Sequence, residues 1–122
     1  MKELLSILKA LSDENRMRIL LMLRIRPVCV CEIEEVLDIA LSTVSQHLRV
    51  LKYAGLIGDT KEGRWVIYHL VEDNPHLASL LPGIERAAGG DPLIRRDREK
   101  IMNMDRESCA MRFRERRKKQ SG

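Results

Sequence analysis

Aromatic residues are scarce in this sequence, which has one Trp, one Phe and two Tyr among its 122 residues. We therefore expect a core of Leu, Ile, Val and Met, which is more typical of packed helices than of a β-sandwich. Cysteine is scarce too, and three is an odd number, too few for a disulfide scaffold. The chain has neither an apolar run of about 20 residues that could span a bilayer nor the cleavage site of a signal peptide. These absences predict a cytoplasmic protein with reduced thiols and no membrane partner.

The charge of the chain is uneven. Its net charge is +4, and residues 91–122 hold eleven Lys and Arg against six Asp and Glu, so the preceding residues are close to neutral. A basic tail attracts nucleic-acid phosphate, but such a tail is equally a solvated end. The length fits one compact domain with an extension, and a domain this small gains stability from dimerisation. The case for nucleic-acid binding must therefore rest on a motif.

Apolar spacing predicts four helices in the first half of the chain. Ser12 offers an N-cap hydroxyl for the second helix and Ser42 one for the fourth. Pro27 closes the second helix, and Gly55 gives the fourth a left-handed end. The predicted helices cover residues 4–11, 12–26, 28–38 and 42–54.

The hydrophobic period changes after residue 56. Residues 57–60 and the alternating residues 65–70 flank the tight-turn sequence Lys61-Glu62-Gly63-Arg64, which predicts a β-hairpin. A further helix opens at Asn74-Pro75, residues 87–90 read as a hinge, and residues 91–120 are expected to form a charged helix. The predicted fold is mainly α with a small β-hairpin. It has a domain over residues 1–88 and a basic C-terminal extension over residues 89–122, helical or partly disordered.

The fourth predicted helix has one apolar and one polar face. Val44, Leu48 and Leu51 fall on a narrow stripe at about 100° per residue. A helix, a short turn and a second helix with small polar residues on its outer face form a helix-turn-helix. The hairpin that follows predicts the winged form of this motif. The alternative is a three-helix bundle with a polar surface. The residues expected to contact double-stranded DNA are Ser42, Thr43, Ser45 and Gln46 at base edges, Arg49, Lys52, Lys61 and Arg64 at phosphates, and His47 within the same motif.

Cys29 and Cys31 lie just before the predicted helix-turn-helix. Thiolates are ligands for soft ions, and a helix start favours their anionic form. The alternative is that both pack in the core as small apolar residues. In a helix that begins at residue 28, Cys29 shares the face of Ile33, whereas Cys31 lies about 200° away and cannot share it. The spacing therefore favours a ligand pair, and joint binding of one ion would require a distorted first turn.

Four segments carry a family resemblance, namely LSDENRMRIL over residues 11–20, VCVCEI over 28–33, STVSQHLRVLK over 42–52 and GLI over 55–57. In this order they resemble the ArsR family of metalloregulatory repressors, over roughly residues 1–85. The resemblance implies a homodimeric winged helix-turn-helix whose first and last helices form the interface. It also implies a repressor that a toxic metal or metalloid releases from its operator DNA.

The resemblance further implies metal ligands. In the arsenic- and cadmium-responsive branches of the family, a Cys-Val-Cys at this place binds the ion, and Cys29 and Cys31 match it residue by residue. The arsenic-responsive pattern often has a third cysteine three residues later, where this chain has Glu34. Trivalent arsenic prefers three thiolates, so Cys109 is either the third ligand, reaching back from the tail of either protomer, or a spare surface cysteine. The extra N-terminal cysteines of the cadmium-responsive arrangement are absent from residues 1–28.

The function implied by these matches is transcriptional repression relieved by As(III) or Sb(III), with no constitutive cofactor. Cd(II) or Pb(II) is the alternative inducer. A second hypothesis is a thiol redox-sensing repressor, in which Cys29 would need Cys109 as its partner, because a bridge to Cys31 closes a very small, strained ring. An enzyme is not expected, since no Cys-x-x-Cys, phosphate loop or paired His and Asp accompanies the thiols.

Overall fold

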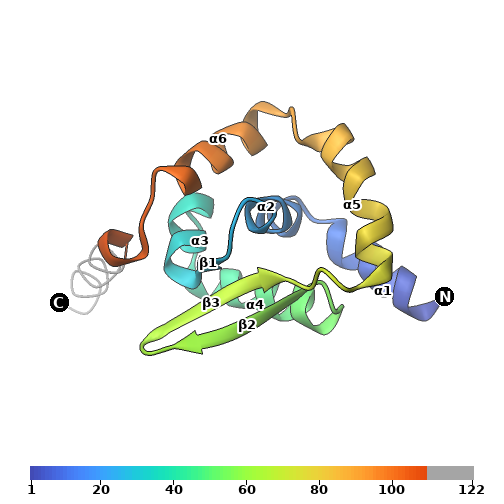
Figure 1. Cartoon of the computed structure of the whole chain (residues 1–122), viewed down its shortest axis with the longest axis horizontal. Coiled ribbons are helices and arrows are strands. Elements are labelled where there is room, and N and C mark those ends of the chain that lie inside the picture. Colours follow the sequence, from blue (N-terminus) through green and yellow to red (C-terminus); the bar gives the residue numbers. More distant parts are fainter. Residues whose placement is uncertain (110–122) are drawn as a thin grey trace.

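The computed structural model describes residues 1–109 as helices and a small antiparallel sheet (Figure 1). In chain order the elements are α1 (Lys2–Leu11), α2 (Glu14–Leu23), β1 (Val28–Cys29), α3 (Val30–Leu37), α4 (Leu41–Tyr53), β2 (Ile57–Glu62), β3 (Trp65–Leu70), α5 (Pro75–Ala88) and α6 (Pro92–Met102). Among the described residues, no helix is both long and apolar enough to cross a membrane. The predicted fold class, mainly α with a small hairpin, is confirmed.

Helix α2 lies at the centre of the fold (Figure 1). Its last five residues, 19–23, are all buried, so it presents apolar surface on every side rather than along one stripe. Helices α1, α4 and α6 and strand β3 pack against it. Burying one Leu or Ile side chain contributes about 1.5–3 kcal/mol. This helix therefore carries much of the stabilisation on which the surrounding elements depend.

The start of α2 differs from the prediction. Asp13, not Ser12, is the N-cap, and its carboxylate accepts a hydrogen bond from the Arg16 backbone N–H at 3.0 Å. The Ser12 hydroxyl instead donates to the carbonyl of Lys9 at 3.0 Å. A charged acceptor interacts more strongly than a hydroxyl with the positive end of a helix, which accounts for the difference. The helix ends at Leu23, well before the proline that was expected to close it.

Helices α3 and α4 form the predicted helix-turn-helix. Helix α3 ends at Leu37, and the following residue, Asp38, turns the chain with a φ of 54°. Helix α4 buries the apolar stripe predicted for it. The predicted cap at Ser42 is wrong, because α4 begins one residue earlier, with Ala40 at the N-cap and no side-chain cap. Gly55, with a φ of 79°, adopts the left-handed conformation expected at the end of α4.

The sheet is antiparallel, with strand order β1-β3-β2. Strands β2 and β3 form the predicted hairpin, and Gly63 takes a φ of 60° at its turn. Strand β1 replaces the start of the predicted third helix: Cys29 is extended, at φ −86° and ψ 162°, and pairs with Ile67. The prediction of a helix from Val28 is therefore wrong. Pairing with β3 gives the backbone of these two residues the partners that a helix would otherwise supply.

The C-terminal part folds back onto the core. Helix α6 packs on α2 and α3 and buries Ile94 and Ile101. The predicted single helix over residues 91–120 is wrong in its described part, because α6 ends at Met102 and a new helical turn begins at Arg106. The rest of that helix, and the end of the basic tail, fall on residues 110–122 and lie outside the described residues. The domain boundary at residue 88 stays a prediction.

Candidate functional site

Helix α4 exposes the polar face that its sequence predicts. Thr43 is half-buried, and the exposed side chains of this face are Ser42, Ser45, Gln46, Arg49 and Lys52. Hydroxyl, amide and guanidinium groups at such positions can exchange hydrogen bonds with base edges and phosphates. The assignment of these residues to DNA contacts stays a prediction.

His47 is turned toward α2. Its side chain is 12% exposed and lies 3.9 Å from the Asp13 carboxylate. Its Nδ1 is 3.3 Å from Nη1 of Arg16, whose Nε donates to the carbonyl of Ala10. The imidazole thus joins α4, the expected DNA-recognition helix, to the start of α2. A DNA contact by His47 would require the ring to leave these partners.

The wing, which is the hairpin of β2 and β3, carries two more of the residues that the sequence predicts to contact phosphate. Lys61 and Arg64 are exposed near the tip of the hairpin, and the Arg64 guanidinium lies 4.8 Å from the centroid of the Trp65 ring. Lys52 at the end of α4 forms an ion pair of 2.9 Å with Asp59 of β2. The recognition helix and the wing are therefore linked directly, in addition to being consecutive in the chain.

The three cysteines of the chain meet in one buried cluster. Cys29 and Cys31 are 1% and 5% exposed, Cys109 is fully buried, and Ile67 of β3 packs with them. The sulfurs of Cys29 and Cys31 are 2.8 Å apart. The prediction that these two lie on opposite faces of one helix is wrong, because Cys29 is in a strand and only Cys31 is in the first turn of α3. Hence the helix needs no distortion to bring them together, and the surface alternative for Cys109 is also wrong.

The thiols of Cys29 and Cys31 are held in their protonated form. The pKa of Cys29 is raised mainly by a hydrogen bond with Cys31 and secondly by burial of the thiol. A hydrogen bond with Cys109 raises the pKa of Cys31 to about 12. The expectation that the helix start favours thiolates is therefore wrong here, since burial and thiol–thiol hydrogen bonds outweigh it. At neutral pH, any ligand of these sulfurs must displace their protons.

The donor set suits a soft ion, but the spacing has to change on binding. Two thiolates that hold one ion tetrahedrally, at a sulfur–ion distance of about 2.3 Å, lie about 3.8 Å apart. The observed separation of 2.8 Å is a thiol–thiol contact, so the gap must open by about 1 Å. Within residues 1–109, no set of three or more His, Cys, Asp or Glu side chains is already arranged to hold a metal ion. Binding therefore requires the two sulfurs to move apart, by rotation of the cysteine side chains or by a shift of β1 or of the start of α3.

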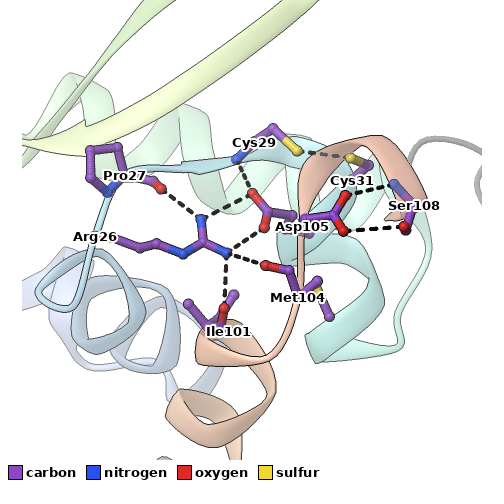
Figure 2. A network of polar contacts seen from close by, with 9 residues as sticks. Arg26, Pro27, Cys29, Cys31, Ile101, Met104, Asp105 and Ser108 are labelled. Atoms are coloured by element: carbon purple, nitrogen blue, oxygen red, sulfur yellow. Dashed lines mark hydrogen bonds and ion pairs between the residues drawn. The ribbon is translucent and has the colours of Figure 1, made fainter.

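A buried ion pair lies beside the thiols (Figure 2). Glu32 is 1% exposed, and its carboxylate accepts a hydrogen bond of 3.0 Å from the backbone N–H of Cys29 and two from the guanidinium of Arg26. Arg26 also donates to the carbonyls of Ile101 and Met104, at 2.9 and 3.1 Å. Sequence reasoning missed both residues. A signal was present for Glu32. It is the third residue of α3, the position from which an acidic side chain can accept a hydrogen bond from the backbone N–H of the N-cap residue, here Cys29.

Fold and site together define a winged helix-turn-helix DNA-binding protein. Residues 13–58 match the family described as bacterial regulatory proteins of the arsR family. The sequence is 32% identical over 111 residues to the arsenical resistance operon repressor of Escherichia coli, an alignment that spans 87% of this chain and 88% of that one. The chain belongs to the ArsR family. It is thus a transcriptional repressor rather than an enzyme.

Further matches include a relative named for another metal and two solved structures. A cadmium resistance regulatory protein, the CadC homolog of Staphylococcus aureus, is 37% identical over 76 residues, or 62% of this chain and 61% of its own. Among solved structures, HlyU from Vibrio cholerae is 30% identical with a TM-score of 0.65, over 72% of this chain and 94% of its own. The homodimeric winged helix-turn-helix domain of Mb0332 from Mycobacterium bovis is 27% identical with a TM-score of 0.61, over 74% of this chain and 86% of its own.

Proposed function

We propose that this protein leaves its operator when trivalent arsenic, or trivalent antimony, binds Cys29, Cys31 and Cys109. The observation that supports the proposal is the meeting of all three cysteines in one buried cluster, although Cys109 is far from the other two in sequence. Three sulfurs are the ligand set that trivalent arsenic prefers. Cd(II) and Pb(II) are the alternative inducers, and one relative is named for cadmium resistance.

Arsenite condenses with such thiols without a net change in protons. Each As–S bond replaces an As–OH bond of As(OH)₃, and the thiol proton leaves with the hydroxide as water, so no atom is oxidised or reduced. A divalent cation instead releases a proton for each thiol that it binds. Raised thiol pKa values therefore oppose cation binding at neutral pH, whereas the condensation with arsenite consumes the protonated form directly.

The cluster is connected to both elements that are expected to contact DNA. Cys29 pairs with Ile67, so a strand of the wing runs beside the first thiol. Cys31 lies in the first turn of α3, and α3 packs on the recognition helix α4. Drawing the three sulfurs into one coordination shell is proposed to shift α3 relative to the wing. In this proposal, that shift leaves the DNA-contacting surface mismatched to the operator.

A release titration tests the assignment of the inducer. A labelled duplex, selected by the protein from a random-sequence pool, is bound and then titrated with arsenite, antimonite, cadmium, zinc and lead in parallel, with release followed by fluorescence anisotropy. Arsenite and antimonite are expected to release the duplex at the lowest concentrations. Release by cadmium or lead alone would contradict the metalloid assignment and support the alternative.

The pH dependence of the same titration separates the two chemistries. With the thiols protonated, the affinity for cadmium should rise about tenfold per thiol bound for each pH unit between about pH 6 and pH 8. The affinity for arsenite should stay nearly constant over that interval, because no proton is released. Isothermal titration in buffers of different ionisation enthalpy counts the protons. Proton release on arsenite binding would contradict this stoichiometry.

We propose DNA contacts by the exposed residues of α4 and the wing, and two variants test them. Gln46→Ala should weaken operator binding by about 1–3 kcal/mol and relax base preference, whereas Arg49→Ala should weaken binding to all sequences alike and reduce its salt dependence. Arg96→Ala is the matched control, since Arg96 is exposed on α6. If both α4 variants bind like the parent and like this control, the recognition helix is misassigned.

We also propose that the protein acts as a homodimer. A single recognition helix covers one half-site, and dimers place two of them about 34 Å apart. Leu5 and Leu8 of α1 remain 48% and 44% exposed in the single chain, so apolar surface is left for a second copy. The Mycobacterium bovis neighbour is homodimeric.

Redox sensing is the second candidate, and the packing of Cys109 in one buried cluster with Cys29 and Cys31 supports it. Hydrogen peroxide would oxidise two thiols to a disulfide, with both thiol protons and both oxygens of the peroxide leaving as two waters. A peroxide arm in the release titration separates the candidates. Release by peroxide, with reversal by a dithiol and no response to arsenite, would favour this function.

A further inference from the structure

We infer that Arg26 and Glu32 are a positioning pair that brings the thiol of Cys109 to those of Cys29 and Cys31. The inference rests on the proposed function, because it concerns how the third ligand is delivered. In this chain α3 has Glu34 where a third cysteine of the helix would stand. The three-sulfur site therefore depends on a non-covalent link between two distant segments.

Glu32 is the fixed end of this link. Its carboxylate is almost completely buried and accepts the backbone N–H of Cys29 at 3.0 Å. A buried carboxylate requires a counter-charge, and the Arg26 guanidinium supplies it by pairing with both oxygens. The pair thereby holds the strand residue that carries the first thiol at a defined distance from Arg26.

Arg26 is the bridging end. The Nη2 that faces Glu32 also donates to the carbonyl of Ile101, at 2.9 Å, and to that of Met104, at 3.1 Å. These carbonyls lie in the last turn of α6 and just beyond it, where a helix leaves its acceptors without intrahelical partners. A fork of fixed N–H groups can satisfy a carboxylate and two carbonyls together, which a single ammonium group on a flexible stem does less well.

The segment after Met104 completes the connection (Figure 2). Asp105 caps the next helical turn: its carboxylate accepts the Ser108 N–H at 2.9 Å and the Ser108 hydroxyl at 3.2 Å. Its backbone carbonyl accepts the N–H of Cys109 at 3.1 Å. Because the turn begins directly after the carbonyls that Arg26 holds, its position fixes where the Cys109 sulfur lies.

The test removes the pair without leaving a buried charge. In the Arg26→Gln/Glu32→Gln double variant, both side chains stay polar and no unpaired ion is created. Arg24→Gln is the matched control, because Arg24 pairs with Glu85 at the surface and Glu85 keeps Arg98. Two readouts are taken on the full chain: the rate of Cys109 alkylation by iodoacetamide without any ion, and the number of sulfurs around arsenic by X-ray absorption.

The double variant is expected to alkylate Cys109 at least tenfold faster than the parent and to bind arsenic through two sulfurs instead of three. The control should match the parent in both readouts. Slow alkylation or three sulfurs in the double variant would overturn the inference. If the double variant does not fold, Arg26→Lys replaces it; the single ammonium should give an intermediate alkylation rate, and a rate equal to that of the parent would overturn the inference.

Failure of the proposed function gives a different result. If the parent itself binds arsenic through two sulfurs, and Cys109→Ser releases the operator like the parent, Cys109 is not a ligand. The inference is then overturned together with that ligand assignment, whereas three sulfurs in both parent and double variant overturn the inference alone.

Discussion

Replacing both Cys29 and Cys31 by serine should leave operator binding intact and abolish release by arsenite. The two proposed ligands lie in β1, which pairs with β3, and in the first turn of α3, and neither lies on the exposed face of α4. For hundredfold release, arsenite must favour the DNA-incompetent state by about 2.7 kcal/mol, and DNA must weaken arsenite binding equally. The double variant loses this entire coupling. Anisotropy titrations of operator affinity, with and without arsenite, measure both quantities.

Controls for this variant follow from the burial of the thiols. A hydroxyl in place of a buried thiol can destabilise the fold by about 1–3 kcal/mol, so the Cys29→Ala/Cys31→Ala pair is measured beside it. Trp65, the single tryptophan, packs against the cluster and reports on its integrity by fluorescence. Normal arsenite release from either double variant would rule out the proposed mechanism.

Replacing Arg18 by alanine should destabilise the protein by about 3–5 kcal/mol, because it leaves a buried carboxylate without its counter-charge. Arg18 of α2 donates to both oxygens of Asp97 on α6, at 2.8 and 2.9 Å, and the Asp97 side chain is only 2% exposed. The carboxylate also raises the pKa of Arg18. Urea denaturation followed by circular dichroism measures the loss.

A double variant separates the charge effect from packing. Arg18→Met/Asp97→Leu replaces both partners by apolar groups of similar size, and such replacements are often neutral or stabilising. It should therefore recover most of the stability that Arg18→Ala loses. Equal destabilisation of the two variants would show that packing, rather than the unpaired carboxylate, holds α6 on α2.

The recognition helix could be predicted from sequence because its signal is periodic and local. Val44, Leu48 and Leu51 repeat at helical spacing, and that repeat alone decides which face of α4 is buried. Strand β1 has no such signal, since it spans two residues and exists through its pairing with β3. The predicted helix began at residue 28, and it therefore placed Cys29 and Cys31 on opposite faces, whereas in the structure their sulfurs are in contact.

The position of Cys109 could not be predicted for a related reason. Cys109 lies in the cluster with the other thiols, and Arg26 holds the segment before it by hydrogen bonds to backbone carbonyls, acceptors that leave no mark on the sequence. The family resemblance identified the first two cysteines and gave two alternatives for the third. The packing of α6 on α2 and α3, together with these hydrogen bonds, is visible only in the structure and accompanies the buried position of Cys109.

The thiol cluster joins the start of α3 to the last described residue of the chain, and this affects the order in which a newly made molecule matures. Synthesis proceeds from the N-terminus, and early segments fold first. The helix-turn-helix and the wing are complete by residue 70, whereas the cluster requires residue 109. Contacts between such distant residues also form slowly, because a long loop must close first. A nascent copy thus has the whole helix-turn-helix and the hairpin available for folding before Cys109 can join the other two thiols.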